Sequence, residues 1–430
     1  MGNVGTVVIL AAGAGTRFLS KKPKVCQPLC GRPLIGWVLD QAFALEPECV
    51  VLVVGHGSEA VRAAAEGEVP PAERARLRFV LQAERRGTGH AVQQALPELA
   101  SGDPVIVLYG DMPLLGSASL RALCAALGGA RMAMLTAEVH KPRGFGRILR
   151  AGGRFAGVVE EKDANAEQRA IREVNVGVYA FRRADLERFL PRLSDRNAQK
   201  ELYLTDVPAM VLADGGAVEA LVLADEREAI GINTIEHLAE ARTALQYQIL
   251  ARHMANGVYV EDPATTFVDH GVEIAPGARI LPCTVIRAGV RIGADCEVGP
   301  FTHLRAGTVL EPGAEIGNFT EAKNARVGAH TKAKHLSYLG DVTIGKNVNI
   351  GAGTIVANYD GKTKHATVIG DRAFVGSGSV LIAPCTVGEG ALTGGGAVLT
   401  RNSSVPPGEA WVGVPARPLR KPLGKKDDDA

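Results

Sequence analysis

The chain has 430 residues, which is long enough for more than one domain. Charged residues make up 22% of it and the formal net charge is only +2, which argues against a nucleic-acid-binding or membrane-surface protein, because these carry a basic excess. Glycine is abundant, at 51 residues, and aromatic residues are scarce, at 5%, which indicates many tight turns between small side chains.

The seven cysteines are scattered, and Cys26 and Cys30 have no second pair that would complete a zinc site. We therefore expect reduced thiols in a cytoplasmic protein. The apolar run at the N-terminus lacks a basic leader and is too short for a signal peptide or a membrane span. No later run is long enough to cross a bilayer.

The first half of the chain alternates apolar runs with helix-like stretches. The first run, TVVILAAGAGTRF, is typical of a buried parallel strand followed by a glycine-rich loop. This alternation predicts an α/β domain with a mostly parallel, doubly wound, Rossmann-like sheet, in which ligands bind at the carboxyl ends of the strands. The later apolar runs cover 49–55, 78–84, 104–114, 132–139 and 176–181, and helical patterns cover 34–45 and 90–96.

Several residues of this half are suited to a phosphate site. Gly13 and Gly15 allow backbone N–H groups to face an anion, and Arg17 and Lys24 add positive charge nearby. Asp111 follows the run VIVLYG at a strand end, where a carboxylate could hold Mg²⁺ against phosphates. Each feature also fits an ordinary alternative, namely a tight turn for the glycines and a helix cap or turn for the aspartate.

Residues 232–257 have the pattern of an amphipathic connecting helix that ends at Asn256-Gly257. The apolar residues at helical spacing are Ile235, Leu238, Ala241, Leu245 and Ile249. We interpret this segment as a packed spacer.

From Ile274 to Ile316 an aliphatic residue recurs every six positions, and the spacing resumes between Ile369 and Leu399. This period does not fit an α-helical face, but it is typical of a hexapeptide solenoid, a parallel β-helix with one inward residue per flat face. We interpret the stretch around 323–361 as a break in the repeat, where side chains such as that of His335 project from the frame and form a site.

Two ordered sets of motifs cover nearly the whole chain. The first half contains LAAGAGTR, PKV, LQAERRGTGHA, LYGDMPL, GFGRI, VVEEKDA and EVNVGVY, and the second contains HLRAG, GNFTEAKNARVG, KAKHLSYLGD, NVNIGAGT and NYDG. The chain thereby resembles the family of bifunctional N-acetylglucosamine-1-phosphate uridylyltransferases/glucosamine-1-phosphate N-acetyltransferases. The resemblance implies a nucleotidyltransferase domain at 1–228, a linker helix at 229–252 and a left-handed hexapeptide β-helix with acetyltransferase activity at 253–430.

For the first half, the resemblance implies that a sugar phosphate attacks the α-phosphate of UTP in line and expels pyrophosphate, so that no protein nucleophile is needed. The residues implied around UTP are Leu10, Ala11, Ala12, Gly13, Arg17, Lys24, Gln82, Gly87 and Thr88. Those implied around the sugar phosphate are Tyr109, Gly146, Glu160 and Asn175, and those implied around Mg²⁺ are Asp111 and Asn233. An amide such as that of Gln82 suits uracil because it both donates and accepts hydrogen bonds.

For the second half, the resemblance implies acetyl transfer from acetyl-CoA to glucosamine-1-phosphate. His335 is the implied general base, since an imidazole titrates near neutral pH, and Glu321 is expected to orient it. The residues implied around the sugar phosphate are Arg305, Lys323, Tyr338 and Asn349. Those implied around acetyl-CoA are Ala352, Asn358, Tyr359, Lys364, Ser377 and Gly395, with Arg417 and Arg420 as candidates for the CoA phosphates.

Together the two reactions would make UDP-N-acetylglucosamine, a precursor of bacterial cell-wall polymers. The resemblance also implies a homotrimer, with no nucleic-acid or membrane partner. Two alternatives are a single-activity nucleotidyltransferase whose solenoid only oligomerises, and a catalytically inactive regulatory subunit. The cluster around His335 argues against the first, and the intact charges at Arg17, Lys24 and Asp111 argue against the second. The charged tail at 424–430 is expected to be disordered.

Overall fold

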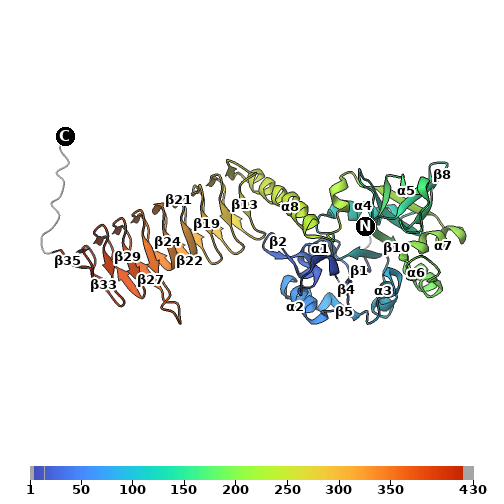
Figure 1. Ribbon diagram of the computed structural model, residues 1–430, viewed down its shortest axis with the longest axis horizontal. Helices are drawn as coiled ribbons and strands as arrows, with labels where there is room; N and C mark the ends of the chain where they lie inside the picture. Colours follow the sequence, from blue (N-terminus) through green and yellow to red (C-terminus); the bar gives the residue numbers. More distant parts are fainter. Residues whose placement is uncertain (1–3, 14, 420–430) are drawn as a thin grey trace. The chain divides into compact units, whose positions relative to one another are not determined.

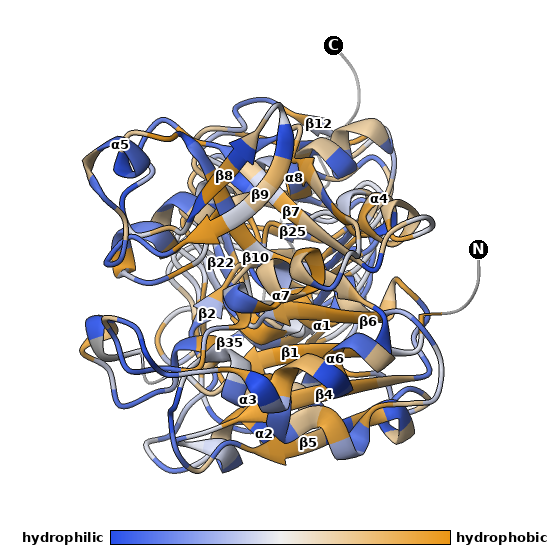
Figure 2. Ribbon diagram, turned by 90° about the vertical axis from the view of Figure 1, so that its right-hand side faces the viewer, coloured by the Kyte–Doolittle hydropathy of each residue, from blue (hydrophilic) through white to orange (hydrophobic). Residues whose placement is uncertain are grey.

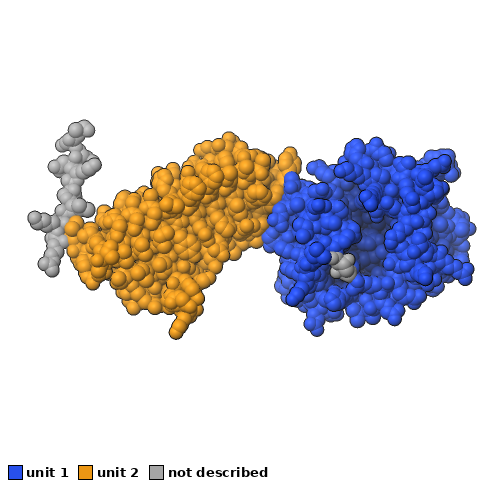
Figure 3. Space-filling model, viewed as in Figure 1, with its two compact units in different colours: residues 1–244 blue, residues 245–430 orange. Residues whose placement is uncertain are grey.

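The computed structural model describes residues 4–13 and 15–419, and the chain divides into two compact units between Ala244 and Leu245 (Figure 3). The expected CoA contact Arg420 and the charged tail lie outside the described residues. None of the described helices combines the length and the apolar character that a membrane crossing needs.

The first unit is built on a nine-stranded sheet whose main path runs β11-β7-β10-β6-β1-β4-β5 (Figure 1). Strands β5, β4, β1 and β6 are parallel, as are β7 and β11, whereas β10 is antiparallel to both of its neighbours. The expected doubly wound, mostly parallel sheet is therefore confirmed, with the run at 176–181 in the reversed strand. The strands of the path are β1 (Thr6–Ala11), β4 (Cys49–Val54), β5 (Leu77–Leu81), β6 (Val105–Tyr109), β7 (Met132–Glu138), β10 (Glu173–Phe181) and β11 (Val218–Val222), and β8 (Arg147–Ala151) and β9 (Arg154–Val159) form a hairpin beside β10.

Both faces of this sheet are buried, because alternate side chains of each strand enter two different cores. In β1, Val7 and Ile9 join the core that contains α1, α2 and α4, whereas Val8 and Leu10 join the core that contains α3, α6 and α7. The strands β1 and β4 are accordingly hydrophobic along their length (Figure 2). The helices are α1 (Leu34–Phe43), α2 (Ser58–Glu68), α3 (Thr88–Ala95), α4 (Ser117–Ala126), α5 (Ala166–Arg169), α6 (Arg183–Phe189) and α7 (Val207–Ala213).

The connecting segment forms the long helix α8 (Ile235–Ala255), as its pattern predicts. Ala241, Leu245 and Ile249 are buried, but Ile235, which the pattern places on the same face, is 64% exposed. The first turn of the helix therefore lacks the packing that the spacing suggests.

The second unit is a prism with three faces of short parallel strands, and each strand pairs with the strand three repeats further along, as Val285 does with His303. The first face contains β12 (Tyr259–Val260), β15 (Arg279–Ile280), β18 (Glu297–Val298), β21 (Glu315–Asn318), β23 (Lys332–His335), β25 (Asn349–Ile350), β28 (Phe374–Val375), β31 (Leu392–Thr393) and β34 (Ala410–Val412), followed by the antiparallel β35 (Arg417–Pro418). The second contains β13 (Phe267–Val268), β16 (Val285–Ile286), β19 (His303–Leu304), β22 (Glu321–Val327), β24 (Tyr338–Ile344), β26 (Ile355–Ala357), β29 (Val380–Ile382) and β32 (Val398–Leu399). The third contains β14 (Glu273–Ile274), β17 (Arg291–Ile292), β20 (Val309–Leu310), the far ends of β22 and β24, β27 (Thr367–Ile369), β30 (Cys385–Val387) and β33 (Ser404–Val405).

The six-residue spacing identifies the inward side chains correctly, which confirms the β-helix. The repeat residues that are buried are Ile280, Ile286, Ile292, Val298, Leu304, Leu310 and Ile316 in the first series and Ile369, Val375, Leu381, Val387, Thr393 and Leu399 in the second. The first residue of the series, Ile274, is half-buried.

The expected break at 323–361 is wrong for most of that stretch, because the coils continue through it. The buried residues that continue the series are Ala322, Val327, Ala333, Leu339, Ile344, Ile350 and Val356. Two steps are one residue shorter than the rest, and their corners are turned by Asn324 and Asp341 at φ 47° and 48°. Asn and Asp adopt this left-handed conformation more readily than other non-glycine residues. The real departure is the loop at 358–366, between β26 and β27.

Candidate active sites

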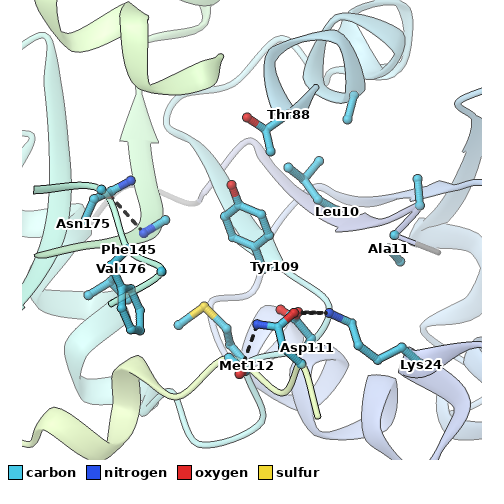
Figure 4. Close-up of a pocket in the computed structure, with 18 of the residues that line it drawn as sticks. Leu10, Ala11, Lys24, Thr88, Tyr109, Asp111, Met112, Phe145, Asn175 and Val176 are labelled. Atoms are coloured by element: carbon cyan, nitrogen blue, oxygen red, sulfur yellow. Dashed lines mark hydrogen bonds and ion pairs between the residues drawn. The ribbon is translucent and has the colours of Figure 1, made fainter. Parts of the chain in front are cut away.

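A cavity of about 520 Å³ opens at the carboxyl ends of the parallel strands of the first unit. It is lined by every residue that the resemblance implies for UTP, the sugar phosphate and the metal in the first half. Figure 4 shows Tyr109 in the middle of it, with Asn175 and Val176 on one side and Leu10 and Ala11 on the other. Segments far apart in the sequence therefore meet at the edge of the sheet where ligands of such folds bind.

The loop after β1 brings a lysine close to the glycine-rich turn. Gly15 has φ 59°, and a Cβ atom on it would lie 2.8 Å from Cβ of Lys24. Only glycine therefore allows this approach without a shift of the backbone. Lys24 begins the short helix η2 (Lys24–Cys26), and its side chain enters the cavity.

Positive and negative groups converge at the floor of the cavity. The ammonium of Lys24 forms an ion pair with Asp111, which follows β6, and also donates to Oδ1 of Asn233 over 3.2 Å (Figure 4). Arg17 Nη2 donates to the same Asn233 oxygen over 2.8 Å. The side chains of Lys24 and Asp111 are only 11% and 15% exposed, so their attraction is weakly screened by solvent.

The two predicted metal ligands fit a small hard cation. Oxygens of Asp111 and Asn233 already converge on one cationic group, the ammonium of Lys24. No cluster of three or more His, Cys, Asp or Glu side chains that could hold a metal occurs in the described parts of the chain. The protein would thus supply part of a coordination shell, which is typical of Mg²⁺ bound between a carboxylate and substrate phosphates.

The wall opposite the glycine-rich turn presents buried polar groups. Asn175 donates from Nδ2 to the hydroxyl of Tyr179 over 2.7 Å, and its backbone N–H donates to the carbonyl of Gly146 over 2.9 Å. Glu160 accepts a hydrogen bond from the hydroxyl of Thr205 over 2.9 Å, and burial raises the pKa of this carboxyl. Polar groups held in place by their neighbours in this way are suited to hydrogen bonding with the hydroxyls of a sugar.

Tyr109 packs against a position where only glycine fits. Burial raises the pKa of Tyr109 above its ordinary value, so the phenol stays protonated and can donate a hydrogen bond. A Cβ atom on Gly177 would overlap the ring of Tyr109 and lie 2.9 Å from its Cδ2. Gly177 therefore sets the position of the ring.

The third part of the cavity surrounds Gln82, which is 5% exposed at the end of β5. Its Nε2 donates to the carbonyl of Gly87 over 3.1 Å and lies 3.1 Å from Nδ1 of His90. Thr88 begins α3, and its hydroxyl oxygen accepts from the N–H of Leu204 over 3.1 Å.

Four further charged or titratable residues line this cavity, and the motif analysis assigned them no role. They are Arg85, Arg143, Glu201 and His237. Arg85 lies inside the motif LQAERRGTGHA, so its charge could have been noticed there. The other three come from segments whose approach to the cavity depends on the tertiary fold.

On the β-helix, His335 lies exposed at the corner between the first and second faces. Backbone hydrogen bonds stack the same corner of successive coils, for example from Gly378 N to Ala352 O over 2.7 Å and from Gly396 N to Ser377 O over 2.7 Å. His335, Ala352, Ser377 and Gly395 therefore occupy one exposed column. Glu321 Oε1 pairs with Arg305 Nη1 over 2.7 Å, and the described residues show no hydrogen bond between Glu321 and the ring, where we expected one.

A cationic cluster lies at the corner between the second and third faces. Arg305 follows β19, Lys323 lies in the next coil, and Lys364 reaches them from the loop at 358–366. The Lys364 amine, followed by Arg305, lowers the pKa of Lys323. The three cations outnumber the two nearby carboxylates, Glu321 and Asp341, which favours binding of an anion. Lys364, which we expected at acetyl-CoA, lies next to Lys323, which we expected at the sugar phosphate.

The remaining residues predicted for acetyl transfer are distributed over the first and second faces, the loop at 358–366 and β35. Tyr338 lies on the second face in register with Glu321, Asn349 lies on the first face, and Asn358 and Tyr359 begin the loop. Arg417 lies in β35 and donates to the carbonyl of Ala416 over 2.9 Å. None of these five residues lines the cavity of about 330 Å³ that the described part of the β-helix contains beside Lys364.

The fold and the two sites define a class: a nucleotidyltransferase joined to a hexapeptide-repeat transferase. Residues 7–200 match the family described as the MobA-like NTP transferase domain, and residues 366–401 match the bacterial transferase hexapeptide (six repeats).

Full-length relatives narrow this class. The chain is 44% identical over 432 residues to the bifunctional protein GlmU of Aromatoleum aromaticum, covering 92% of this chain and 93% of that protein. It is 44% identical over 439 residues to the protein of the same name from Thiobacillus denitrificans, covering 94% and 93%. For the one from Kineococcus radiotolerans the identity is 43% over 446 residues, covering 95% and 89%. The chain belongs to the family of the bifunctional protein GlmU.

Proposed function

We propose that this protein makes UDP-N-acetylglucosamine in two steps. The β-helix, at 253–430, acetylates glucosamine-1-phosphate with acetyl-CoA. The α/β domain, at 1–228, then transfers UMP from UTP to N-acetylglucosamine-1-phosphate and releases pyrophosphate, and residues 229–252 link the two. The observation that carries this proposal is the presence of two separate constellations, namely the charged cavity of the first unit and, on the second unit, an exposed imidazole at one corner of the β-helix with a cationic cluster at the next corner. The product supplies cell-wall synthesis.

In uridylyl transfer, the protein positions two phosphates and neutralises their charge. Asp111 and Asn233 are the residues that would hold Mg²⁺, which supplies electrostatic stabilisation of the phosphates when bound. Arg17, which donates to Asn233, and Lys24, which contacts both Asp111 and Asn233, would pair with the triphosphate of UTP. Gln82 would bind the uracil edge, since a side-chain amide offers both a donor and an acceptor.

The sugar would bind along the wall that carries Tyr109, Glu160 and Asn175. Glu160 and Asn175 are held by Thr205 and Tyr179, so the hydroxyl-binding groups are fixed before the sugar arrives. Preorganised groups of this kind orient the phosphate of the sugar for attack in line with the leaving pyrophosphate.

In acetyl transfer, His335 would accept the proton of the sugar amine as its nitrogen attacks the carbonyl carbon of the thioester. The attack forms the amide bond, and the carbon–sulfur bond then breaks to release CoA thiolate, which takes up a proton. The exposed position of the imidazole leaves it accessible to both substrates. Arg305 and Lys323 would hold the sugar phosphate, and the exposed column at Ala352, Ser377 and Gly395 would receive acetyl-CoA.

We propose that the protein acts as a homotrimer in the cytoplasm. An exposed apolar ridge beside His335 consists of Phe301, Phe319 and Leu336, whose exposed fractions are 51%, 60% and 61%. The two phenylalanine rings stack with their centroids 5.2 Å apart. Such a ridge is suited to a partner chain, and a partner would enclose acetyl-transfer groups that one chain leaves apart. The seven free cysteines fit a reducing compartment.

The proposal is tested with the purified full-length protein and Mg²⁺. Glucosamine-1-phosphate and acetyl-CoA without UTP should release CoA, and N-acetylglucosamine-1-phosphate and UTP without acetyl-CoA should release pyrophosphate. Pyrophosphate release without any CoA release would support a single-activity nucleotidyltransferase instead.

A further inference from the structure

The loop at 358–366, which projects beside β27, is a short hairpin with a fixed base (Figure 1). Asn358 is 6% exposed and donates from Nδ2 to Asp341, which also accepts from Asn324 Nδ2 over 2.7 Å. The carbonyl of Asn358 accepts from the N–H of His365 over 2.8 Å and closes the hairpin. Corner residues of two earlier coils therefore hold the point where the loop leaves the β-helix.

The turn of this hairpin is organised around one carboxylate. Oδ1 of Asp360 accepts from the backbone N–H groups of Lys362 and Thr363 over 2.9 and 2.8 Å. The N–H of Thr363, assisted by His365, Lys362 and Arg401, holds the pKa of Asp360 well below its ordinary value. Asp360 is therefore ionised and available to a cation outside the loop.

That cation is Arg401, which lies in the turn after β32, beyond the loop along the chain. Its Nη2 donates to Oδ2 of Asp360 over 2.9 Å and also contacts Nε2 of His365, which lies 2.8 Å from the same Asp360 oxygen. The side chains of Asp360 and His365 are 27% and 26% exposed, so this contact is partly shielded from solvent. The loop is thus anchored at its base to earlier coils and at its turn to a later one.

The anchoring opposes a repulsion at the far side of the loop. Lys364 points into the cluster with Lys323 and Arg305, and these like charges repel one another until an anion binds. Lys364, His365 and Ala366 also line a cavity of about 330 Å³, together with Asn324, Arg326 and Thr343 of earlier coils. A loop without its second anchor would be free to carry Lys364 away from the cluster and close or widen this cavity.

We propose that Arg401 is a positioning residue for acetyl transfer, which acts through Asp360 and His365 to hold the loop that carries Tyr359 and Lys364. The proposal rests on the function assigned to the β-helix. Arg401 touches neither the cationic cluster nor His335 in the described hydrogen bonds and ion pairs, so its effect on catalysis passes through the loop.

The test compares Arg401→Ala with Arg401→Lys and with the control Arg372→Ala in the full-length protein. Arg372 is also a solvent-exposed arginine of the β-helix and pairs with Glu389 of a neighbouring coil, but it does not contact the loop. CoA release is measured against glucosamine-1-phosphate and acetyl-CoA concentrations, pyrophosphate release is measured in the same preparations, and thermal unfolding is followed by circular dichroism.

We expect Arg401→Ala to raise KM for at least one acetyl-transfer substrate about tenfold, the scale of one charge-assisted hydrogen bond, with a smaller change in kcat. Arg401→Lys should recover part of the loss, because it keeps the charge. Asp360→Asn should show the same defect, and the double variant should be no worse than either single one. Pyrophosphate release and the unfolding temperature should match those of Arg372→Ala.

Two results would overturn the proposal. The first is that Arg401→Ala leaves the KM values of both acetyl-transfer substrates unchanged. The second is that its acetyl-transfer activity falls no more than that of Arg372→Ala, or falls together with the unfolding temperature, because either finding would indicate a purely structural role. Wild-type protein that releases no CoA at all would instead overturn the function assigned to the β-helix, and the positioning role with it.

Discussion

The packing of Gly177 on Tyr109 makes Gly177→Ala a sharp test of the sugar-binding wall. Gly177 has φ 84°, a conformation that costs an L-residue about 1 kcal/mol. The new methyl group would also overlap the Tyr109 ring, and overpacking of this kind costs about 1–3 kcal/mol more. Gly152 is the matched control, because it has φ 56° but a Cβ atom added to it would meet only open space.

The two substitutions should separate backbone strain from displacement of the ring. For a domain of this size, 1 kcal/mol lowers Tm by roughly 2–4 °C, so Gly152→Ala should lower Tm of the first unit by about that amount. Gly177→Ala should lower it two to four times as far. Only Gly177→Ala should raise KM for N-acetylglucosamine-1-phosphate, by about tenfold or more, because only it displaces Tyr109 from the cavity.

The assay is steady-state pyrophosphate release, with CoA release from the same preparation as an internal reference. The β-helix contains neither glycine, so acetyl transfer should be unaffected by both substitutions. If Gly177→Ala had the same Tm and the same KM as Gly152→Ala, the position assigned to Tyr109 in sugar binding would be refuted.

Two further predictions concern a buried carboxyl and the apolar ridge. Burial raises the pKa of Glu160, so its contribution to stability is fully present below the ordinary glutamate pKa of about 4.3 and is lost as pH rises through the raised value. Glu160→Gln should therefore increase Tm at pH 7–8 relative to wild type, with a difference that shrinks towards pH 4 in thermal scans; a difference that grows as pH falls would contradict this. Phe319→Ser should weaken the proposed trimer in sedimentation velocity and reduce CoA release much more than pyrophosphate release, whereas the exposed Val222→Ser should do neither. A Phe319→Ser protein that sediments as wild type would show that the ridge is not an interface.

The sequence predicts the parts of this molecule that depend on local pattern. The buried strand TVVILA needs only its own apolar run, and the inward residues from Ile280 to Ile316 need only a fixed spacing. The order of the motifs was also enough to predict which residues of the first half line one cavity.

Contacts between coils were not predictable in the same way. The coils continue past Lys323, but the two steps that turn at Asn324 and Asp341 are five residues long instead of six. A strict six-residue count therefore loses the inward positions after the first of these steps. Glu321 pairs with Arg305 rather than His335, because stacking of the coils places those two side chains together. The hydrogen bond from Arg401 to Asp360 likewise depends on how the loop at 358–366 folds against a later coil, and no spacing in the sequence predicts it.

The central claim is that one chain contains two independent transferase sites, and two substitutions test it together. His335→Ala should abolish CoA release from glucosamine-1-phosphate and leave pyrophosphate release from N-acetylglucosamine-1-phosphate and UTP near the wild-type rate. Asp111→Ala should do the reverse, because it removes the carboxylate that pairs with Lys24 in the first unit and leaves the β-helix intact. If each substitution, in a protein with wild-type thermal unfolding, reduced both activities to the same extent, the claim of two separate sites would be contradicted.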